Sequence, residues 1–308
     1  MMTERATRGQ GLTRSIAQNG GPVITRFAPS PTGRLHLGHA YSAIRSHDFA
    51  RTRGGHFVLR IEDTDTARCR PGHVEAIYRD LEWLGLEWDA LMIQSERLAV
   101  YAAALDRLRQ MDLIYPCFCT RADIAREIAA SLHAPHGVDG PLYPGTCRTA
   151  PQSAREGRLA SDPHCWRLDA AAAIQHAGPL IWGDSAAGQV PVNIAALGDL
   201  VLKGRDRPTS YHLAVVVDDA AQGVTDVVRG EDIFASTHAQ RILQALLGLP
   251  TPDYHHHGLV AGSDGLRLAK RADAPTLEQL RLAGKDGRAL AEMVRRGALP
   301  IGNGMVTA

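Results

Sequence analysis

The sequence predicts an α/β protein built on a doubly wound (Rossmann-type) nucleotide-binding sheet that is interrupted by an insertion. Two observations support this prediction. Short apolar strands alternate with amphipathic helices over residues 23–115, and the alternation returns over residues 197–260. Between these stretches, residues 116–196 are rich in cysteine, histidine, proline and glycine and have a poor helical period, which is typical of an insertion.

The elements can be justified in chain order. Val58, Leu59 and Ile61 are the apolar residues of a strand, whereas Ile77 and Leu81 recur at helical spacing. Before the insertion we expect a strand at residues 22–28, a helix at 38–54, a strand at 56–63, and helices at 74–86 and 97–115. After it we expect strands at residues 211–220 and 226–233, a helix at 235–249, and a last segment, 261–308, that is helical in part.

The composition is that of a globular protein of ordinary charge. The chain has 308 residues, 44% hydrophobic and 22% charged, so it can bury a full core without disulfides. A formal net charge of +1 gives no bulk argument for a nucleic-acid partner, which must be inferred from local motifs. No apolar run approaches the roughly 18 residues of a membrane helix, and residues 1–22 lack the apolar core of a secretory signal. We therefore expect a cytoplasmic protein with a disordered tail at residues 1–22.

Two histidines, His36 and His39, stand where the first helix should begin, in the stretch RFAPSPTGRLHLGHAYSAI. The first backbone N–H groups of a helix are unpaired and its dipole favours negative charge, so a strand, a glycine-containing turn and a helix start form a good phosphate site. Gly33 and Gly38 would let a nucleotide approach the backbone. For a bare H-x-x-H pair, two surface histidines placed by chance would be the better interpretation. The surrounding prolines and glycines favour phosphate chemistry.

Several motifs resemble one enzyme family. PSPTGRLHLGH (29–39) is similar to the HIGH signature of class I aminoacyl-tRNA synthetases, with the lead-in of the glutamyl/glutaminyl branch. The other motifs are RIEDTD (60–65), YHLAVVVDD (211–219), VVRGEDI (227–233) and, at the KMSKS position, LRLAKRADAP (266–275). Only residues 271–308 follow Lys270, too few for an anticodon-binding domain, and the insertion carries CFC and YPGTC. Together these features resemble the glutamyl-queuosine tRNA(Asp) synthetase family, a truncated glutamyl-tRNA synthetase paralog.

The resemblance implies an activity and its partners. It implies tRNA-independent activation of L-glutamate with ATP and Mg²⁺, then transfer of glutamate to the queuosine base in the anticodon of tRNA(Asp), by a monomer without a membrane partner. Two alternatives stay open: a truncated glutamyl-tRNA synthetase that charges a tRNA 3′ end, and a non-catalytic paralog that only binds tRNA or glutamate. The implied organisation is a tail (1–22), two halves of the catalytic domain (23–115 and 197–260), an insertion with a zinc site (116–196) and the KMSKS-like loop with a C-terminal segment (261–308).

The resemblance also implies site residues. ATP is assigned to His36, Gly38, His39 and Lys270, of which His36, His39 and Lys270 are catalytic. Glutamate is assigned to Arg26, Phe27, Ala28, Pro29, Ser30, Glu62, Tyr211 and Arg229. Arginine suits planar carboxylates and an acid suits the ammonium. Read alone, Glu62 could be a surface carboxylate and Arg229 a solvated strand end. The KMSKS-like loop departs from its motif, because Ala269 replaces serine and Arg267 and Arg271 replace lysine and serine.

The insertion is expected to bind one structural zinc ion. Five cysteines are an odd number, which argues against a disulfide framework. The resemblance implies the ligands Cys117, Cys119, Tyr143 and Cys147. From chemistry alone His133, His136 or His164 would replace the tyrosine, and a cluster of buried cysteines without metal is the alternative. Cys69 and Cys165 match no ligand position.

A second histidine-rich stretch, YHHHG (254–258), lies shortly before the KMSKS-like loop. Consecutive residues of a strand face opposite sides, so His255, His256 and His257 cannot all converge on a metal. We expect His256 to face the nucleotide.

Overall fold

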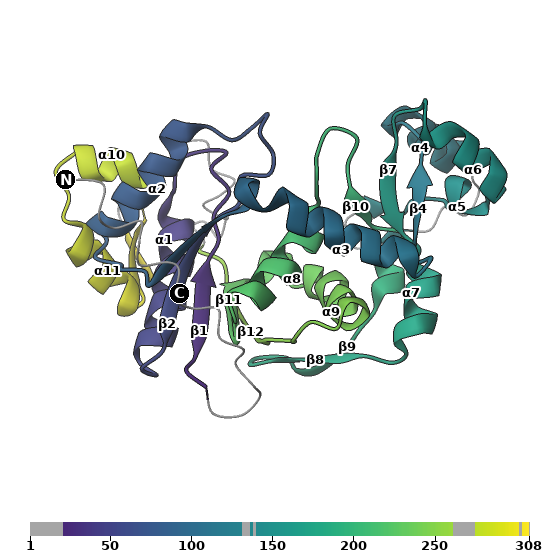
Figure 1. Ribbon diagram of the computed structural model, residues 1–308. Coiled ribbons are helices and arrows are strands. Elements are labelled where there is room, and N and C mark those ends of the chain that lie inside the picture. Colours follow the sequence, from purple (N-terminus) through teal and green to yellow (C-terminus); the bar gives the residue numbers. More distant parts are fainter. Residues whose placement is uncertain (1–20, 131–135, 138–139, 261–274, 302–303, 308) are drawn as a thin grey trace.

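The computed structural model describes residues 21–130, 136–137, 140–260, 275–301 and 304–307 (Figure 1). Its helices are α1 (Leu37–Arg51), α2 (Pro71–Trp83), α3 (Leu98–Gln110), α4 (Arg121–Ala130), α5 (Thr146–Thr149), α6 (Gln152–Leu159), α7 (Ala170–Ala177), α8 (Tyr211–Ala221), α9 (Ser236–Leu247), α10 (Leu277–Leu282) and α11 (Gly287–Arg295). Its strands are β1 (Ile24–Phe27), β2 (His56–Ile61), β3 (Ala90–Ile93), β4 (Ile114–Cys117), β5 (His136–Gly137), β6 (Gly140–Pro141), β7 (Cys165–Leu168), β8 (Ile181–Asp184), β9 (Gly188–Pro191), β10 (Val201–Lys203), β11 (Asp226–Gly230), β12 (Asp253–His257), β13 (Ala298–Ile301) and β14 (Gly304–Thr307).

The central layer is made of two parallel strand groups that meet at β1 and β11. The first group has the order β1-β2-β3 and the second the order β11-β12-β8-β9, with β9 antiparallel to β8. The Thr225 N–H donates to the Ile24 carbonyl at 3.0 Å, and the Ile24 N–H donates to the Thr225 hydroxyl at 2.8 Å. The strand order therefore reverses between β1 and β11, and α/β folds place their ligands at such a switch point.

Helices pack against this layer, and they form separate apolar clusters. The helix α1 packs on β1, β2 and β11, and α2, α10 and α11 extend the same cluster, which includes Ile44, Leu81 and Leu290. A second cluster joins α3, α7, α8 and α9 and includes Leu108, Val216 and Leu243. Figure 1 shows α10 and α11 at one end of the molecule and α4, α5 and α6 at the other. The switch point lies between these ends.

The segment at residues 211–220 was predicted to be a strand, and this prediction is wrong. The residues form α8, which begins after Ser210, whose hydroxyl accepts the Leu213 N–H at 3.2 Å. The residues Leu213–Asp219 are all buried, with α3 and α9 packed against the helix. A run that is buried on every side has no polar face to show a period, so the sequence cannot separate a buried helix from a buried strand here.

The boundary between the small sheet of the insertion and the central layer does not lie at residue 196, where the insertion was expected to end. The strands β4, β7 and β10 form an antiparallel sheet of their own, in the order β10-β7-β4, although β10 follows residue 196. The strands β8 and β9 lie before residue 196, yet β8 pairs in parallel with β12. The polypeptide therefore enters the small sheet, returns to the central layer and passes through the small sheet again before α8.

Within the described residues, no helix combines the length and the apolar character that a membrane span requires. The predicted helix at residues 38–54 is confirmed as α1, and Gly54 follows it with a φ of +66°, a left-handed conformation that glycine adopts without strain. The predicted tail at residues 1–22 falls almost wholly outside the described part of the chain.

We predict that Ser210→Ala destabilises the protein by about 1 kcal/mol, because the first turn of α8 loses its side-chain cap. Ser210→Asp should keep most of the stability, since aspartate accepts the same N–H. Chemical denaturation measures the difference, and Ser153→Ala on the exposed side of α6 is the control. Equal stability of Ser210→Ala and Ser153→Ala would show that the cap contributes nothing.

Candidate functional site

One cavity of about 730 Å³ opens at the switch point between β1 and β11. Eleven residues predicted for glutamate or ATP lie on its wall: Arg26, Phe27, Ala28, Pro29, Ser30, His36, Gly38, His39, Glu62, Tyr211 and Arg229. The wall also includes residues that were not predicted from the sequence, among them Ser42, Asp232, His257 and Val260. Lys270 and its neighbours Ala269 and Arg271 lie outside the described residues.

The two motif histidines cap the helix that carries them. The Gly38 N–H donates to His36 Nδ1 at 3.1 Å, and the His36 N–H donates to His39 Nδ1 at 3.2 Å. A backbone N–H can only donate, so both rings accept at Nδ1 and carry their proton on Nε2. A Cβ on Gly38 would lie 3.0 Å from His36 Cε1, so this glycine makes room for the imidazole.

Both histidines are held neutral. Burial lowers the pKa of His36. Burial and the neighbouring His36 lower the pKa of His39 to about 3, and the two ring centroids are 3.9 Å apart. The His36 and Gly38 N–H groups are already bonded to the two rings, so the mouth of α1 offers two neutral Nε2–H donors close together, which is an arrangement that suits an anion.

A buried group of four charges lies behind the Arg26 side of the cavity. Arg60 Nη1 donates to Asp219 Oδ1 at 2.7 Å, and Arg26 Nε donates to the same oxygen at 3.3 Å. Arg60 also donates to Glu62 Oε1 from Nε at 3.3 Å and from Nη2 at 3.2 Å. Burial raises the pKa of Glu62, and Arg60 and Arg26 oppose the rise.

Arg60 and Asp219 were not predicted as site residues, although the sequence carries a signal for both. Each is a charge inside an apolar run, FVLRI and AVVVDD, and a buried charge requires a partner. In addition, Arg60 and Glu62 are two positions apart, which directs both side chains to one face of an extended segment.

Arg229 is held by residues of α9 and β12. Its Nη2 donates to Thr237 Oγ1 at 2.6 Å, its Nη1 to Gln240 Oε1 at 2.9 Å, and its Nε to His256 Nε2 at 3.0 Å. Longer contacts of 3.4 Å join it to the Tyr211 hydroxyl and the Ile233 carbonyl. The two long contacts are the weakest, so a ligand carboxylate would replace these most readily.

The expectation that His256 faces the nucleotide is wrong. Its Nδ1 lies 2.7 Å from Asp184 Oδ2, and burial followed by the charge of Arg229 lowers its pKa to about 4. His255 turns to Asp226 at 2.8 Å, and His257 is the one of the three that lines the cavity. The three side chains therefore point to different partners, because neighbouring residues of β12 alternate between faces.

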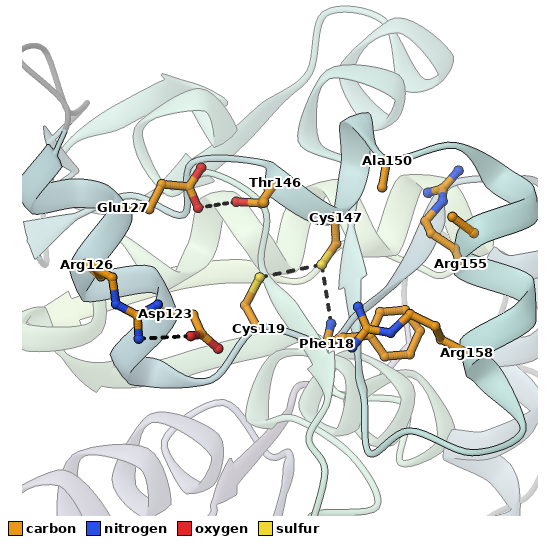
Figure 2. Close-up of a pocket in the computed structure, with 11 residues that line it drawn as sticks. Phe118, Cys119, Asp123, Arg126, Glu127, Thr146, Cys147, Ala150, Arg155 and Arg158 are labelled. Atoms are coloured by element: carbon orange, nitrogen blue, oxygen red, sulfur yellow. Dashed lines mark hydrogen bonds and ion pairs between the residues drawn. The ribbon is translucent and has the colours of Figure 1, made fainter.

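Three predicted zinc ligands lie together in the insertion. The sulfur atoms of Cys117, Cys119 and Cys147 all lie within 4.8 Å of one another, and the Cys119–Cys147 separation is 3.5 Å (Figure 2). The Tyr143 hydroxyl is 3.4 Å from Cys117 Sγ and 3.5 Å from Cys119 Sγ. Tetrahedral zinc with Zn–S bonds of about 2.3 Å keeps its sulfur ligands about 3.8 Å apart, so this donor set fits a zinc ion.

Cys165 lies next to this cluster without belonging to it. It pairs with Cys117 across β4 and β7, and it is not one of the three mutually close sulfur atoms. A hydrogen bond from Cys165 lowers the pKa of Cys117 to about 4 despite burial. His164 contacts the ring of Phe118, with centroids 5.7 Å apart, and is not in the cluster. His133 is outside the described residues, as is the side chain of His136.

A second cavity of about 540 Å³ adjoins Cys119 and Cys147. Figure 2 shows Arg126, Arg155 and Arg158 around it, with Arg158 stacked on the ring of Phe118. Arg126 and Arg158 are paired with Asp123 and Asp162, so most of the positive charge at this cavity is already neutralised.

Comparisons with known proteins agree with this geometry. The model of the class I tRNA synthetase (E and Q) catalytic domain matches residues 22–304. The glutamyl-Q tRNA(Asp) synthetase of Rhodobacter capsulatus is 49% identical over 267 residues, covering 85% of this chain and 96% of the relative. The enzyme of the same name from Deinococcus radiodurans is 44% identical and covers 88% of each chain.

Solved structures give the same family of folds. A glutamate tRNA ligase from Elizabethkingia meningosepticum, solved in complex with its amino acid, has a TM-score of 0.74 and 28% identity. The glutamate-tRNA synthetase from Elizabethkingia anophelis has a TM-score of 0.75 and 28% identity. Each match covers 90% of this chain, which spans only 61% and 62% of the two ligase chains.

Proposed function

The chain belongs to the glutamyl-Q tRNA(Asp) synthetase family of class I tRNA synthetases, and on this premise we propose that it activates L-glutamate with ATP and transfers the glutamyl group to queuosine in the anticodon of tRNA(Asp). One observation carries the proposal. A single cavity at the switch point joins two arginines and a buried acid to a helix start capped by two histidines. Glutamate and a nucleotide phosphate therefore have matching groups side by side.

The amino acid would bind on the arginine side of the cavity. Arg26 and Arg229 supply planar cations for the two carboxylates, and Glu62 supplies an anion for the ammonium. Tyr211 and Ser30 add hydroxyl groups, while Phe27, Ala28 and Pro29 bring the end of β1 and the segment after it to the cavity wall. Glutamine would leave one arginine facing an uncharged amide, so the pair of arginines favours glutamate.

The nucleotide would bind at the mouth of α1. An α-carboxylate oxygen of glutamate attacks the α-phosphorus of ATP, the bond to the β-phosphoryl oxygen breaks, and pyrophosphate leaves. Negative charge grows on the α-phosphoryl oxygens during this step, and the Nε2–H groups of His36 and His39 donate to it. Gly38 allows His36 to sit over the helix start. We assign Lys270 to the pyrophosphate charge and expect Mg²⁺ to enter with ATP.

In the second step a hydroxyl oxygen of the queuosine cyclopentenediol attacks the glutamyl carbonyl carbon, the bond from this carbon to the phosphate oxygen breaks, and AMP leaves as its phosphate takes up the hydroxyl proton. We also assign one structural zinc ion to Cys117, Cys119, Tyr143 and Cys147, because these four donors lie at distances that suit tetrahedral zinc. The ion would hold β4 against α5 and so stabilise the insertion.

The acceptor distinguishes this proposal from a truncated glutamyl-tRNA synthetase. A short anticodon stem-loop carrying queuosine should accept labelled glutamate, and the same stem-loop with guanine should accept none because it lacks the diol. Periodate, which cleaves vicinal diols, should destroy the acceptor even when the 3′ end is blocked. Label on a 3′-terminal ribose, or charging of unmodified glutamate tRNA at a similar rate, would support the truncated synthetase instead.

We predict that His36→Ala and His39→Ala each slow glutamate-dependent pyrophosphate exchange by about 10²–10³-fold with a much smaller change in the KM for ATP. The reason is that these donors meet charge that develops mainly in the transition state. His47→Ala is the matched control, since His47 is on α1 but not on the cavity wall. A higher KM with an unchanged maximal rate would contradict the assigned role.

We predict one zinc ion per chain by elemental analysis, lost in Cys147→Ser and retained in the control Cys69→Ser. Cys165→Ser should also retain zinc, because Cys165 is outside the set of three mutually close sulfur atoms. Loss of zinc in Cys165→Ser with retention in Tyr143→Phe would make Cys165 the fourth ligand. Full occupancy after removal of both Cys117 and Cys119 would show that the ion is held elsewhere.

A further inference from the structure

Arg60 is placed to control the cavity without touching a ligand. Its side chain is 0% exposed, and it is not one of the residues that line the cavity. Its guanidinium instead reaches two carboxylates, Glu62 and Asp219, from β2. A buried arginine with this position can act only through the residues it holds.

Arg60 donates hydrogen bonds to one carboxylate oxygen of Glu62 and not to the other. Both of its bonds to Glu62 end on Oε1, at 3.3 and 3.2 Å, and within the described residues no hydrogen bond reaches Oε2. Glu62 lines the cavity, so Oε2 is the oxygen available to a ligand. The two N–H groups that Arg60 directs at Oε1 therefore fix the orientation of this carboxylate, and the positive charge of the guanidinium balances the carboxylate charge.

Asp219 links Arg60 to Arg26, which lies on the side of the cavity proposed for the substrate carboxylates. Its Oδ1 accepts from Arg60 Nη1 at 2.7 Å and from Arg26 Nε at 3.3 Å. Arg26 has a further contact of 3.5 Å with the Val228 carbonyl, which does not depend on Arg60. The loss of Arg60 should thus disturb Glu62 more than Arg26.

We propose that Arg60 is a positioning residue that makes the cavity select substrates with an ammonium group, because its guanidinium holds Oε1 of Glu62 and leaves Oε2 aimed toward that group. This inference rests on the proposed function and adds a residue that decides one part of its specificity. Arg60 itself does not contact the substrate.

The charges around Glu62 give the direction of the expected pH effect. The groups facing it are Arg26 from β1, Arg60 from β2 and Asp219 from α8. Burial raises the pKa of Glu62, Asp219 adds to the rise, and the two arginines oppose it. Removal of Arg60 takes away the larger opposing charge, so the pKa rises further. A protonated Glu62 can no longer neutralise an ammonium, and the loss should be greatest at low pH.

Glutarate is the probe for this role, because it has both carboxylates of glutamate and no ammonium. Arg60→Gln should raise the KM for glutamate in pyrophosphate exchange about 10- to 100-fold and weaken inhibition by glutarate far less. The acid limb of kcat/KM for glutamate should move to higher pH. Arg60→Lys keeps the charge but loses the fork, so its effect should be intermediate. In a Glu62→Gln background the Arg60 substitutions should no longer change the preference for glutamate over glutarate.

Arg51→Lys is the matched control. Arg51 pairs with Asp89 at 2.8 Å and donates to the Glu87 carbonyl at 2.9 Å, at the far end of α1 from the histidines. Thermal unfolding identifies variants that fail to fold, and if Arg60→Gln is one of them, Arg60→Lys decides the question. Equal weakening of glutamate and glutarate, or kinetics like those of Arg51→Lys, would overturn the proposal. Absence of glutamate-dependent exchange in the unmodified protein would instead overturn the proposed function.

Discussion

The buried charges of Arg26, Arg60, Glu62 and Asp219 are the constraint on which the arrangement of the site depends. A charge removed from water is costly unless a partner lies within hydrogen-bond reach, and these four come from β1, β2, the end of β2 and α8. None of these charges is stable in the protein interior until the elements that carry its partners have packed against it. The requirement that opposite charges meet therefore positions α8 against the two strands, and the same contacts direct Arg26 and Glu62 into the cavity.

Much of the site could be predicted because its residues are grouped in short motifs. The stretch from Arg26 to His39 covers the end of β1, the turn and the start of α1, so neighbours in sequence remain neighbours in space. The predicted class I α/β fold is confirmed by the family match and by the ligase structures. The assignments of Glu62, Tyr211 and Arg229 came from the resemblance, since read alone Glu62 could be a surface carboxylate and Arg229 a solvated strand end.

The errors have a common physical origin, which is long-range contact. α8 was mistaken for a strand because burial on all sides removes the polar face that would reveal its period. The return of β8 to the central layer depends on pairing with β12, about 70 residues later, and local composition carries no sign of it. Likewise, His256 is drawn away from the cavity by Asp184 and Arg229, partners that no local pattern identifies.

The cavity combines two kinds of electrostatics that suit two tasks. On the side of β1 and β11 the two arginines carry permanent charge, and such charges suit the carboxylates of a ligand before any reaction begins. At the mouth of α1 both imidazoles are neutral donors, because each accepts a backbone N–H at Nδ1 and burial lowers its pKa. A neutral donor attracts a resting phosphate less than a cation would, and its attraction grows as negative charge accumulates on the phosphoryl oxygens. For the proposed reaction, the histidine end would therefore contribute more to the chemical step than to binding, while the arginine end would set which amino acid is held.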